Sequence, residues 1–293
     1  MTNNIGRPPE AWRNYSTKVP IAAFRIKRDE LKRLYQIIHA KQIEYRDKVV
    51  ATLSRMPSES NDDFEGRKRK VHDAFVTSVT VTGLDDEMVH GNAEDFFDSS
   101  TFPEHLRSIL ISTQSVPQAI LNFNPPCNVV VFLDFSRPPL FDFSRLPTLP
   151  TPNESNFAIS ADDESWFAAT KARLSQFFTD RRTPTNWLHR GAIYDALLVF
   201  VGIPIGIWLA FRIVGLISSP KISPIIIAAL YVYIFLAALN LFRLLFSYSR
   251  WVFPKVELDT ELASPLRHRG IWGAILLALV ASLLYDCLKS LSS

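Results

Sequence analysis

The residues that could carry chemistry gather in one acidic segment in the first half of the chain. Within 85–98 lie six carboxylates and one imidazole: Asp85, Asp86, Glu87, His90, Glu94, Asp95 and Asp98. Carboxylate oxygens are the ligands that Mg²⁺ and Ca²⁺ prefer, so one prediction is a divalent-metal site at Asp85, Asp86, Glu87 and His90. The spacing differs from that of an EF-hand loop, and a solvated turn leading into a short helix is the competing interpretation.

Motifs of known catalytic mechanism are otherwise absent from the sequence. It contains no Walker A loop, no G-x-G-x-x-G, no H-E-x-x-H, no G-x-S-x-G and no set of kinase motifs. Only 10 of the 293 residues are glycine, which disfavours a phosphate-cradling loop. The basic run at 67–70 has no interleaved aromatic residue, so no specific nucleic-acid partner is expected. We therefore predict no catalytic residues and no cofactor.

Composition narrows the class of protein. The chain has 47% hydrophobic residues, 12% aromatic residues and a net charge of +3, which excludes a disordered tail and a nucleic-acid coat. Its two cysteines, Cys127 and Cys287, lie far apart in the sequence. This excludes a disulfide-rich secreted scaffold and a cysteine-based zinc cluster. The long apolar runs are concentrated in the last third of the chain.

Three apolar segments predict membrane-spanning helices, at about 192–217, 224–247 and 271–288. A helix rises about 1.5 Å per residue, so roughly 20 residues cross a hydrocarbon core about 30 Å thick. The first two segments exceed that length, whereas the third is near the lower limit and either spans the bilayer or lies at its interface. The predicted fold class is an α+β cytosolic domain followed by an α-helical membrane domain, 187–293, of three transmembrane helices.

Aromatic and cationic residues beside these segments predict their orientation. Trp187, Trp251 and Trp272 lie at segment ends, as expected of interfacial anchors. Arginines and lysines precede the first segment and fill the 249–270 loop, and an excess of cations marks the cytoplasmic side. We predict a cytoplasmic N-terminal domain and an external C-terminus in the plasma membrane (the inner membrane of a bacterium). The first 20 residues have no apolar core, so no cleavable signal is predicted.

Four charged residues lie within the apolar segments, where a charge is costly unless it is paired or near a surface. At about 1.5 Å per residue, Asp195 falls at the depth of Arg243, and Arg212 falls at the depth of Asp286. Two ion pairs between helices are therefore predicted, Asp195 with Arg243 and Arg212 with Asp286. The alternative is that the long side chains extend to the headgroups.

Small residues at helix-packing spacing predict contacts between helices. They are Gly202 and Gly206 in the first segment, and Ala274, Ala278 and Ser282 in the third. In lipid, close backbone approach and van der Waals contact drive helix association. The spacing leaves open whether the contacts lie within one chain or between protomers. A homo-oligomer or a protein partner is therefore expected in addition to the lipid bilayer.

The first half of the chain is predicted to form an α+β domain over 26–146, after a tail at 1–25. A 3.6-residue apolar period predicts a helix over 26–54, followed by a polar link at 57–70. Alternating apolar residues then predict four to five mostly antiparallel strands, at 75–83, 88–89, 108–115, 118–123 and 128–135.

Three further segments connect this domain to the membrane. Prolines predict a semi-rigid linker at 147–160. An amphipathic juxtamembrane helix is predicted over 161–185, and it either lies on the membrane surface or closes the soluble core. In loop 249–270, apolar residues alternate from Val252 to Leu258, which predicts an edge strand. This strand is expected to fold against the cytosolic domain and to couple that domain to the helices.

Together these features favour a multi-pass membrane protein without enzymatic activity. Its cytosolic domain would sense an unknown ligand or partner and control helix packing or oligomerisation, in a signalling, channel-like or membrane-effector role. Two alternatives stay open from the sequence. One is a membrane-tethered, divalent-metal-dependent enzyme with its site in the cytosolic domain, and the other is a passive membrane anchor or scaffold.

Overall fold

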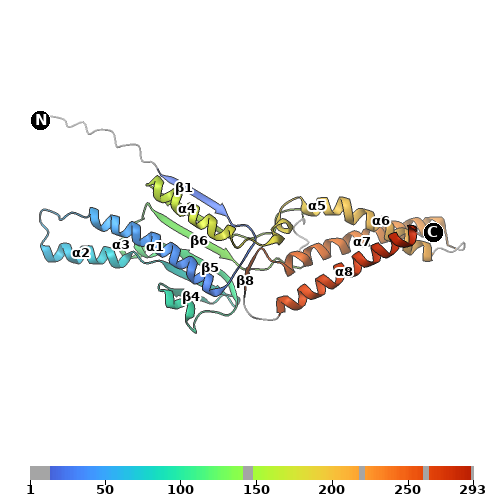
Figure 1. Cartoon of the computed structure of the whole chain (residues 1–293), viewed down its shortest axis with the longest axis horizontal. Helices are drawn as coiled ribbons and strands as arrows, with labels where there is room; N and C mark the ends of the chain where they lie inside the picture. The colour runs from blue at the N-terminus through green and yellow to red at the C-terminus, as the bar shows by residue number, and fades with distance from the viewer. Residues whose placement is uncertain (1–13, 141–147, 218–221, 260–263, 292–293) are drawn as a thin grey trace, which may run out of the picture. The chain divides into compact units, whose positions relative to one another are not determined.

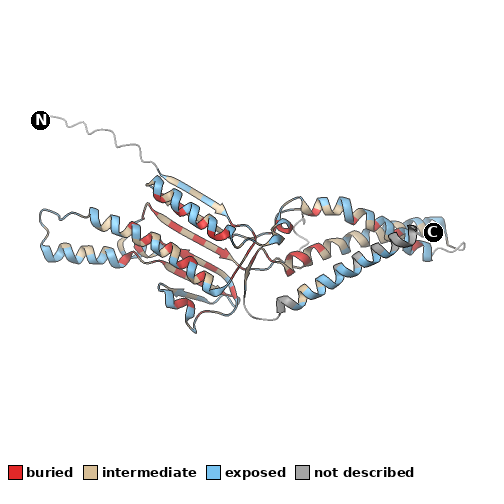
Figure 2. Ribbon diagram, viewed as in Figure 1, coloured by how far each residue is buried: buried red, intermediate tan, exposed pale blue. Residues whose placement is uncertain are grey.

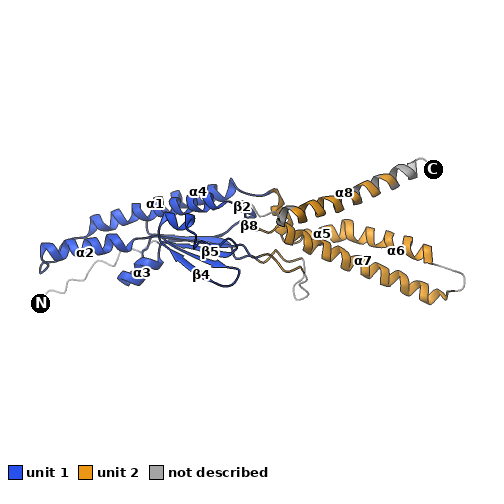
Figure 3. Cartoon of the chain, turned by 90° about the horizontal axis from the view of Figure 1, so that it is seen from below, with its two compact units in different colours: residues 1–136, 153–183, 256–260 blue, residues 137–152, 184–255, 261–293 orange. Residues whose placement is uncertain are grey.

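The computed structural model describes residues 14–140, 148–217, 222–259 and 264–291. The chain divides into two compact units (Figure 3). Unit 1 comprises 1–136, 153–183 and 256–260, and unit 2 comprises 137–152, 184–255 and 261–293. The chain therefore passes from one unit to the other five times, and neither unit is a continuous stretch of sequence.

Unit 1 is built on a six-stranded antiparallel sheet (Figure 1). In spatial order the strands are β1 (Tyr15–Pro20), β7 (Asn156–Ala161), β6 (Asn128–Asp134), β5 (Leu106–Ser112), β3 (Ser78–Gly83) and β4 (Met88–Gly91). Successive side chains of a strand point to opposite faces of the sheet, and the buried side chains of β3 and β6 are Val79, Val81, Val129, Val131 and Leu133. The predicted α+β architecture with an antiparallel sheet is therefore confirmed, but the sheet has six strands rather than the four to five predicted.

The helix α1 (Arg28–Thr52) covers one face of this sheet (Figure 1). Its buried residues recur at the 3.6-residue spacing from which the sequence predicted it: Leu31, Leu34, Ile38 and Tyr45. The side chain of Glu30 accepts a hydrogen bond from the backbone N–H of Lys27 at 2.9 Å, which satisfies an N–H group at the helix start. The predicted helix over 26–54 is confirmed.

The helix α4 (Glu164–Thr179) lies beside α1 on the same face. It begins after Asp163, whose carboxylate accepts hydrogen bonds from the backbone N–H groups of Ser165 and Trp166. Its apolar side is buried in the core of unit 1: Trp166, Leu174, Phe177 and Phe178. In the segment 161–185, the helix therefore closes the core of unit 1, which was the second of its two interpretations.

A second, two-stranded sheet joins distant parts of the sequence within unit 1. The strands β2 (Phe24–Ile26) and β8 (Val256–Leu258) pair in parallel, and Arg25 contacts Glu257 at 3.0 Å across the pair. The backbone N–H of Asp259 extends the pairing by donating to the carbonyl of Ile26 at 2.8 Å. The edge strand predicted in loop 249–270 is thereby confirmed as β8, which belongs to unit 1.

Unit 2 is helical. The helix α5 (Ile193–Leu197), a π-helical turn η3 (Leu198–Gly202) and α6 (Ile203–Ile217) follow one another directly, and α7 (Pro224–Val252) and α8 (Ser264–Leu291) come after them. Among the described residues, two helical stretches are long and apolar enough to cross a membrane, Ile193–Ile217 and Pro224–Val252, rather than the three predicted. The third predicted segment, 271–288, lies within α8. Its apolar run is the shortest and contains Asp286.

Several predicted boundaries in unit 1 are wrong. The tail 1–25 contains β1 and most of β2, and the linker 147–160 contains most of β7. Both β1 and β7 are short strands with polar residues at alternate positions, and their partners lie far away in the sequence. Their register comes from long-range pairing, which local hydrophobic periodicity does not detect.

Two segments adopt a different secondary structure from the one predicted. The polar link at 57–70 is largely the helix α2 (Asn61–Ala74), which Ser60 caps by accepting a hydrogen bond from the N–H of Asp63. The strand predicted at 118–123 is instead the end of the helix α3 (Ser115–Leu121). Before α3, the Ser112 hydroxyl accepts hydrogen bonds from the N–H groups of Gln114 and Ser115. In both cases a side-chain hydrogen bond starts a helix whose apolar pattern is weak.

Candidate functional site

The acidic segment serves mainly as an anchor for neighbouring elements. Lys32 of α1 contacts Asp98 at 2.7 Å and Glu94 at 3.4 Å, in the 3-10 helix η1 (Glu94–Asp98). Asp86 lies in the turn between β3 and β4 and pairs with Arg107 of β5. These carboxylates therefore hold η1 and the turn against unit 1 through opposite charges.

The structure does not gather the predicted metal ligands into one set. Asp85, Asp86 and Glu87 are exposed in the turn, whereas the Nδ1 atom of His90 lies 3.0 Å from the Thr80 hydroxyl on the neighbouring strand. Among the described residues, no group of three or more histidine, cysteine, aspartate or glutamate side chains is placed to hold a metal ion.

The glycines of the first apolar stretch allow its close contact with α7. A Cβ atom placed on Gly202 would lie 3.0 Å from a ring carbon of Phe242, and one on Gly206 would lie 3.2 Å from a ring carbon of Phe235. Both glycines are buried, so their missing side chains let the two backbones approach. Ala274, Ala278 and Ser282 of α8 are exposed and take no part in this contact.

The structure describes the side chains of three of the four charged residues predicted to lie in the membrane: Asp195, Arg212 and Arg243. Asp195 and Arg243 both lie close enough to the Tyr194 phenol to act on it electrostatically, so they share one end of the helix pair. The ion pair between Asp195 and Arg243 stays a prediction. Arg212 is exposed on α6, and the side chain of Asp286 lies outside the described residues. The pairing of Arg212 with Asp286 stays a prediction.

A buried arginine at the end of α7 organises the adjoining loops of unit 2. Arg250 donates from Nε to the carbonyl of Leu188 at 3.0 Å and from Nη1 to the carbonyl of Leu149 at 3.1 Å. A longer bond of 3.4 Å runs from Nη2 to the carbonyl of Arg190. Its guanidinium also lies 4.6 Å from the ring centroid of Phe246. The sequence indicated Arg250 only as one cytoplasmic cation among several, because its burial depends on tertiary packing.

His189 lies within the same group of contacts. It is 5% exposed at the end of the 3-10 helix η2 (Pro184–His189), and its Nδ1 atom lies 2.9 Å from the Thr151 hydroxyl. Its Nε2 atom is buried as well. Burial lowers the pKa of His189 to about 4, and the positive charges of Arg250 and Lys255 act in the same direction. His189 is therefore a neutral imidazole in the folded chain at neutral pH.

The predicted interfacial tryptophans lie on three elements of unit 2. Trp272 of α8 donates from Nε1 to the hydroxyl of Ser249 on α7 at 2.7 Å. The rings of Trp251 and His268 lie edge to face, with their centroids 4.9 Å apart. Trp187 lies on η2 and is half exposed. Trp251 and Trp272 thus join the C-terminal end of α7 to the start of α8.

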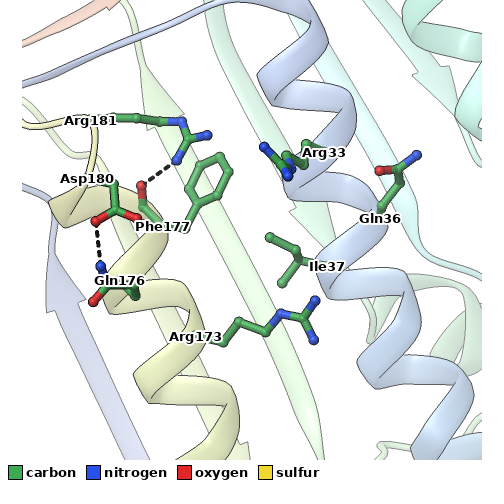
Figure 4. Close-up of a pocket in the computed structure, with 8 residues that line it drawn as sticks. All are labelled: Arg33, Gln36, Ile37, Arg173, Gln176, Phe177, Asp180 and Arg181. Atoms are coloured by element: carbon green, nitrogen blue, oxygen red, sulfur yellow. Dashed lines mark hydrogen bonds between the residues drawn. The ribbon is translucent and has the colours of Figure 1, made fainter.

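Unit 1 contains a groove between α1 and α4 that the sequence analysis did not predict (Figure 4). Its volume is about 410 Å³, and its lining is mostly polar or charged: Arg33, Gln36, Ile37, Arg173, Gln176, Phe177, Asp180 and Arg181. The residues come from two helices that are far apart in the sequence and, for Asp180 and Arg181, from the positions just after α4. Only the packing of α1 beside α4 brings three arginines together, so no local motif indicated them.

Comparison with protein-family models, with curated proteins and with solved structures finds no match to this chain. Its function is therefore inferred from the geometry of its own residues.

Proposed function

We propose that this chain is an integral membrane protein in which unit 1 senses a ligand or partner and controls the packing of the helices of unit 2. The observation that carries the proposal is the place of β8 in the sequence. This strand lies between α7 and α8, and it pairs with β2 in unit 1. A ligand-dependent change in unit 1 would thus act on the ends of two helices through a few residues of chain.

Exposed apolar side chains support the membrane part of the proposal. Phe200, Leu216 and Ile225 are 79%, 86% and 81% exposed, and α6 and α7 are exposed over much of their length (Figure 2). Monomeric proteins in water rarely expose contiguous apolar surfaces of this kind, whereas lipid chains solvate them. The two apolar stretches are therefore proposed to cross the bilayer.

The proposal includes α8 as a third membrane helix. It is 28 residues long and exposes Ile271, Leu277 and Tyr285. About 20 helical residues suffice to cross the hydrocarbon core. The cations near the ends of the apolar segments favour a cytoplasmic unit 1 and an external C-terminus.

The contact between β2 and β8 is the proposed route of coupling. The backbone pairing spans only three residues on each strand, and one of the paired residues of β8, Val256, is buried. Arg25 and Glu257 form an ion pair in which the glutamate side chain is 13% exposed and the arginine side chain 40% exposed. So short a pairing is easily shifted, and reversal of one charge would place two carboxylates opposite each other.

Charge reversal at this pair tests the coupling. Spin labels on cysteines at Leu216 and Ile226 would report the distance between α6 and α7 in the full chain in phosphatidylcholine nanodiscs. Arg25→Glu is expected to shift or broaden that distance distribution, and adding Glu257→Arg is expected to restore it. Lys18→Glu, an exposed change on β1 with the same charge difference, serves as the control. If Arg25→Glu leaves the distribution of the wild type unchanged, the coupling is contradicted.

A further inference from the structure

We infer that the groove between α1 and α4 binds the phosphate group of a phosphate monoester. This inference rests on the proposed function, because it assigns a ligand class to the sensing unit. Phosphate is favoured because planar guanidinium groups bind its oxygens through paired, charge-assisted hydrogen bonds. The volume of about 410 Å³ is within the range of small-ligand sites.

Two arginines supply positive charge that no described residue neutralises. The guanidinium groups of Arg33 on α1 and Arg173 on α4 extend into the space between the two helices (Figure 4). In the described part of the chain, neither group has an ion pair or a hydrogen bond with another residue. Like charges that face a shared groove repel each other, and a bound anion would relieve that repulsion.

Arg181 forms a fixed wall of the groove. Its Nε donates to Glu30 at 2.9 Å and its Nη1 donates to the carbonyl of Phe177 at 2.9 Å. Its guanidinium also lies 3.8 Å from the ring centroid of Phe177. Glu30 offsets the charge of Arg181, but an arginine has five N–H donors, so some stay free for an anion. These contacts orient Arg181 before a ligand arrives.

The remaining lining residues suit a phosphate monoester, in which an organic group is attached to the phosphate. Asp180 is the one carboxylate among the lining residues, and it accepts a hydrogen bond from the Gln176 amide on its own helix (Figure 4). Because Arg181 is paired with Glu30, the two other arginines, Arg33 and Arg173, face this one aspartate, and the net positive charge repels a cation and attracts an anion. Ile37 and Phe177 offer apolar surface on which the rest of the ligand would pack.

The phosphate could belong to a soluble metabolite or to a lipid headgroup, and the experiment separates the two. The full chain would be studied in phosphatidylcholine nanodiscs, with inorganic phosphate titrated at constant ionic strength and binding followed by calorimetry. A parallel set of nanodiscs would contain phosphatidic acid, whose headgroup is a phosphate monoester, with thermal stabilisation as the readout. The variants are Arg33→Gln and Arg173→Gln. The control is Arg69→Gln, on an exposed position of α2.

We expect either single substitution to weaken phosphate binding about tenfold, since a hydrogen bond to a charged group is worth roughly 1.4 kcal/mol or more. Arg69→Gln is expected to bind like the wild type. Binding of free phosphate would identify a soluble ligand, whereas stabilisation by phosphatidic acid alone, lost in Arg33→Gln, would identify a headgroup. Circular dichroism of each variant verifies folding, and Arg173→Lys, which keeps the charge but loses the planar fork, is expected to bind with intermediate strength.

The inference is overturned if neither probe binds, or if Arg33→Gln and Arg173→Gln bind as tightly as Arg69→Gln. The groove lies wholly within unit 1. Phosphate binding by a chain that is not in the membrane would therefore contradict only the proposed function. A membrane-embedded chain that binds no phosphate would contradict only the present inference.

Discussion

Arg250 and His189 are polar side chains buried in unit 2. Arg250 is tolerated because three backbone carbonyls accept its N–H groups. His189 is tolerated because it stays neutral, with one ring nitrogen bonded to Thr151. Arg250 also keeps a positive charge close to the imidazole, which opposes its protonation.

This arrangement predicts a loss of stability in acid. The pKa of His189 is about 4 in the folded chain and near 6.5 when exposed, so the unfolded state takes up the proton first. The neutral His189 side chain therefore contributes to the free energy of unfolding in full above pH 6.5, and this contribution is lost as the pH falls towards 4. The loss amounts to roughly 3 kcal/mol over that interval. Urea unfolding in a mild detergent should therefore be less pH-dependent for His189→Gln than for the wild type.

The control for this experiment is His72→Gln, which removes an exposed imidazole and should follow the wild type. A His189→Gln variant with the same pH dependence as the wild type would show that the buried imidazole does not titrate as described.

Among the elements, the contact of α6 with α7 depends on residues without side chains. The small-residue spacing in the sequence indicated Gly202 and Gly206 as contact positions, and in the structure both face aromatic rings of α7. The partner rings, Phe235 and Phe242, were not indicated, because many apolar residues of α7 have similar spacing. The exposed Ala274, Ala278 and Ser282 have the same spacing, so spacing alone does not identify a contact within the chain.

Gly206→Val tests this packing. The new Cβ would lie 3.2 Å from Phe235 before the two methyl groups are added, so the Phe235 ring must shift or the two helices must move apart. We expect a loss of about 1–3 kcal/mol, as is usual for overpacking. Gly215→Val in the same helix is the matched control, because a Cβ there meets nothing within 4 Å. Thermal unfolding in detergent measures both, and equal melting temperatures for the two variants would refute the contact.

The elements that the sequence predicted well are those with a strong local period. α1 has buried residues every three to four positions, and β3 and β6 alternate strictly. β1 was not predicted because it is an edge strand with exposed alternate positions, and α2 was not predicted because it has few apolar residues. The arginine groove was not predicted for a different reason. Its residues become neighbours only when α1 and α4 pack on one sheet, and no pattern within either helix indicates this.

At the scale of the whole molecule, the main feature is that the chain passes repeatedly between the two units. Residues 137–152 belong to unit 2 although they lie between β6 and β7 of unit 1, and β8 belongs to unit 1 although it lies between α7 and α8. Neither unit can therefore be removed as one continuous fragment. An interleaved chain of this kind suits a protein in which a change in one unit must reach the other, and this is the basis of the proposed sensing role.

The most direct test of the account is the labelling of single cysteines in intact cells. In a chain with Cys127→Ser and Cys287→Ser, a cysteine would be placed at Ser223, which precedes α7, or at Ser54, which follows α1; both positions are exposed. We predict that a membrane-impermeant maleimide labels Ser223→Cys in intact cells but labels Ser54→Cys only after permeabilisation, and that both proteins sediment with membranes. Labelling of Ser54→Cys in intact cells, or recovery of the chain in the soluble fraction, would contradict the account.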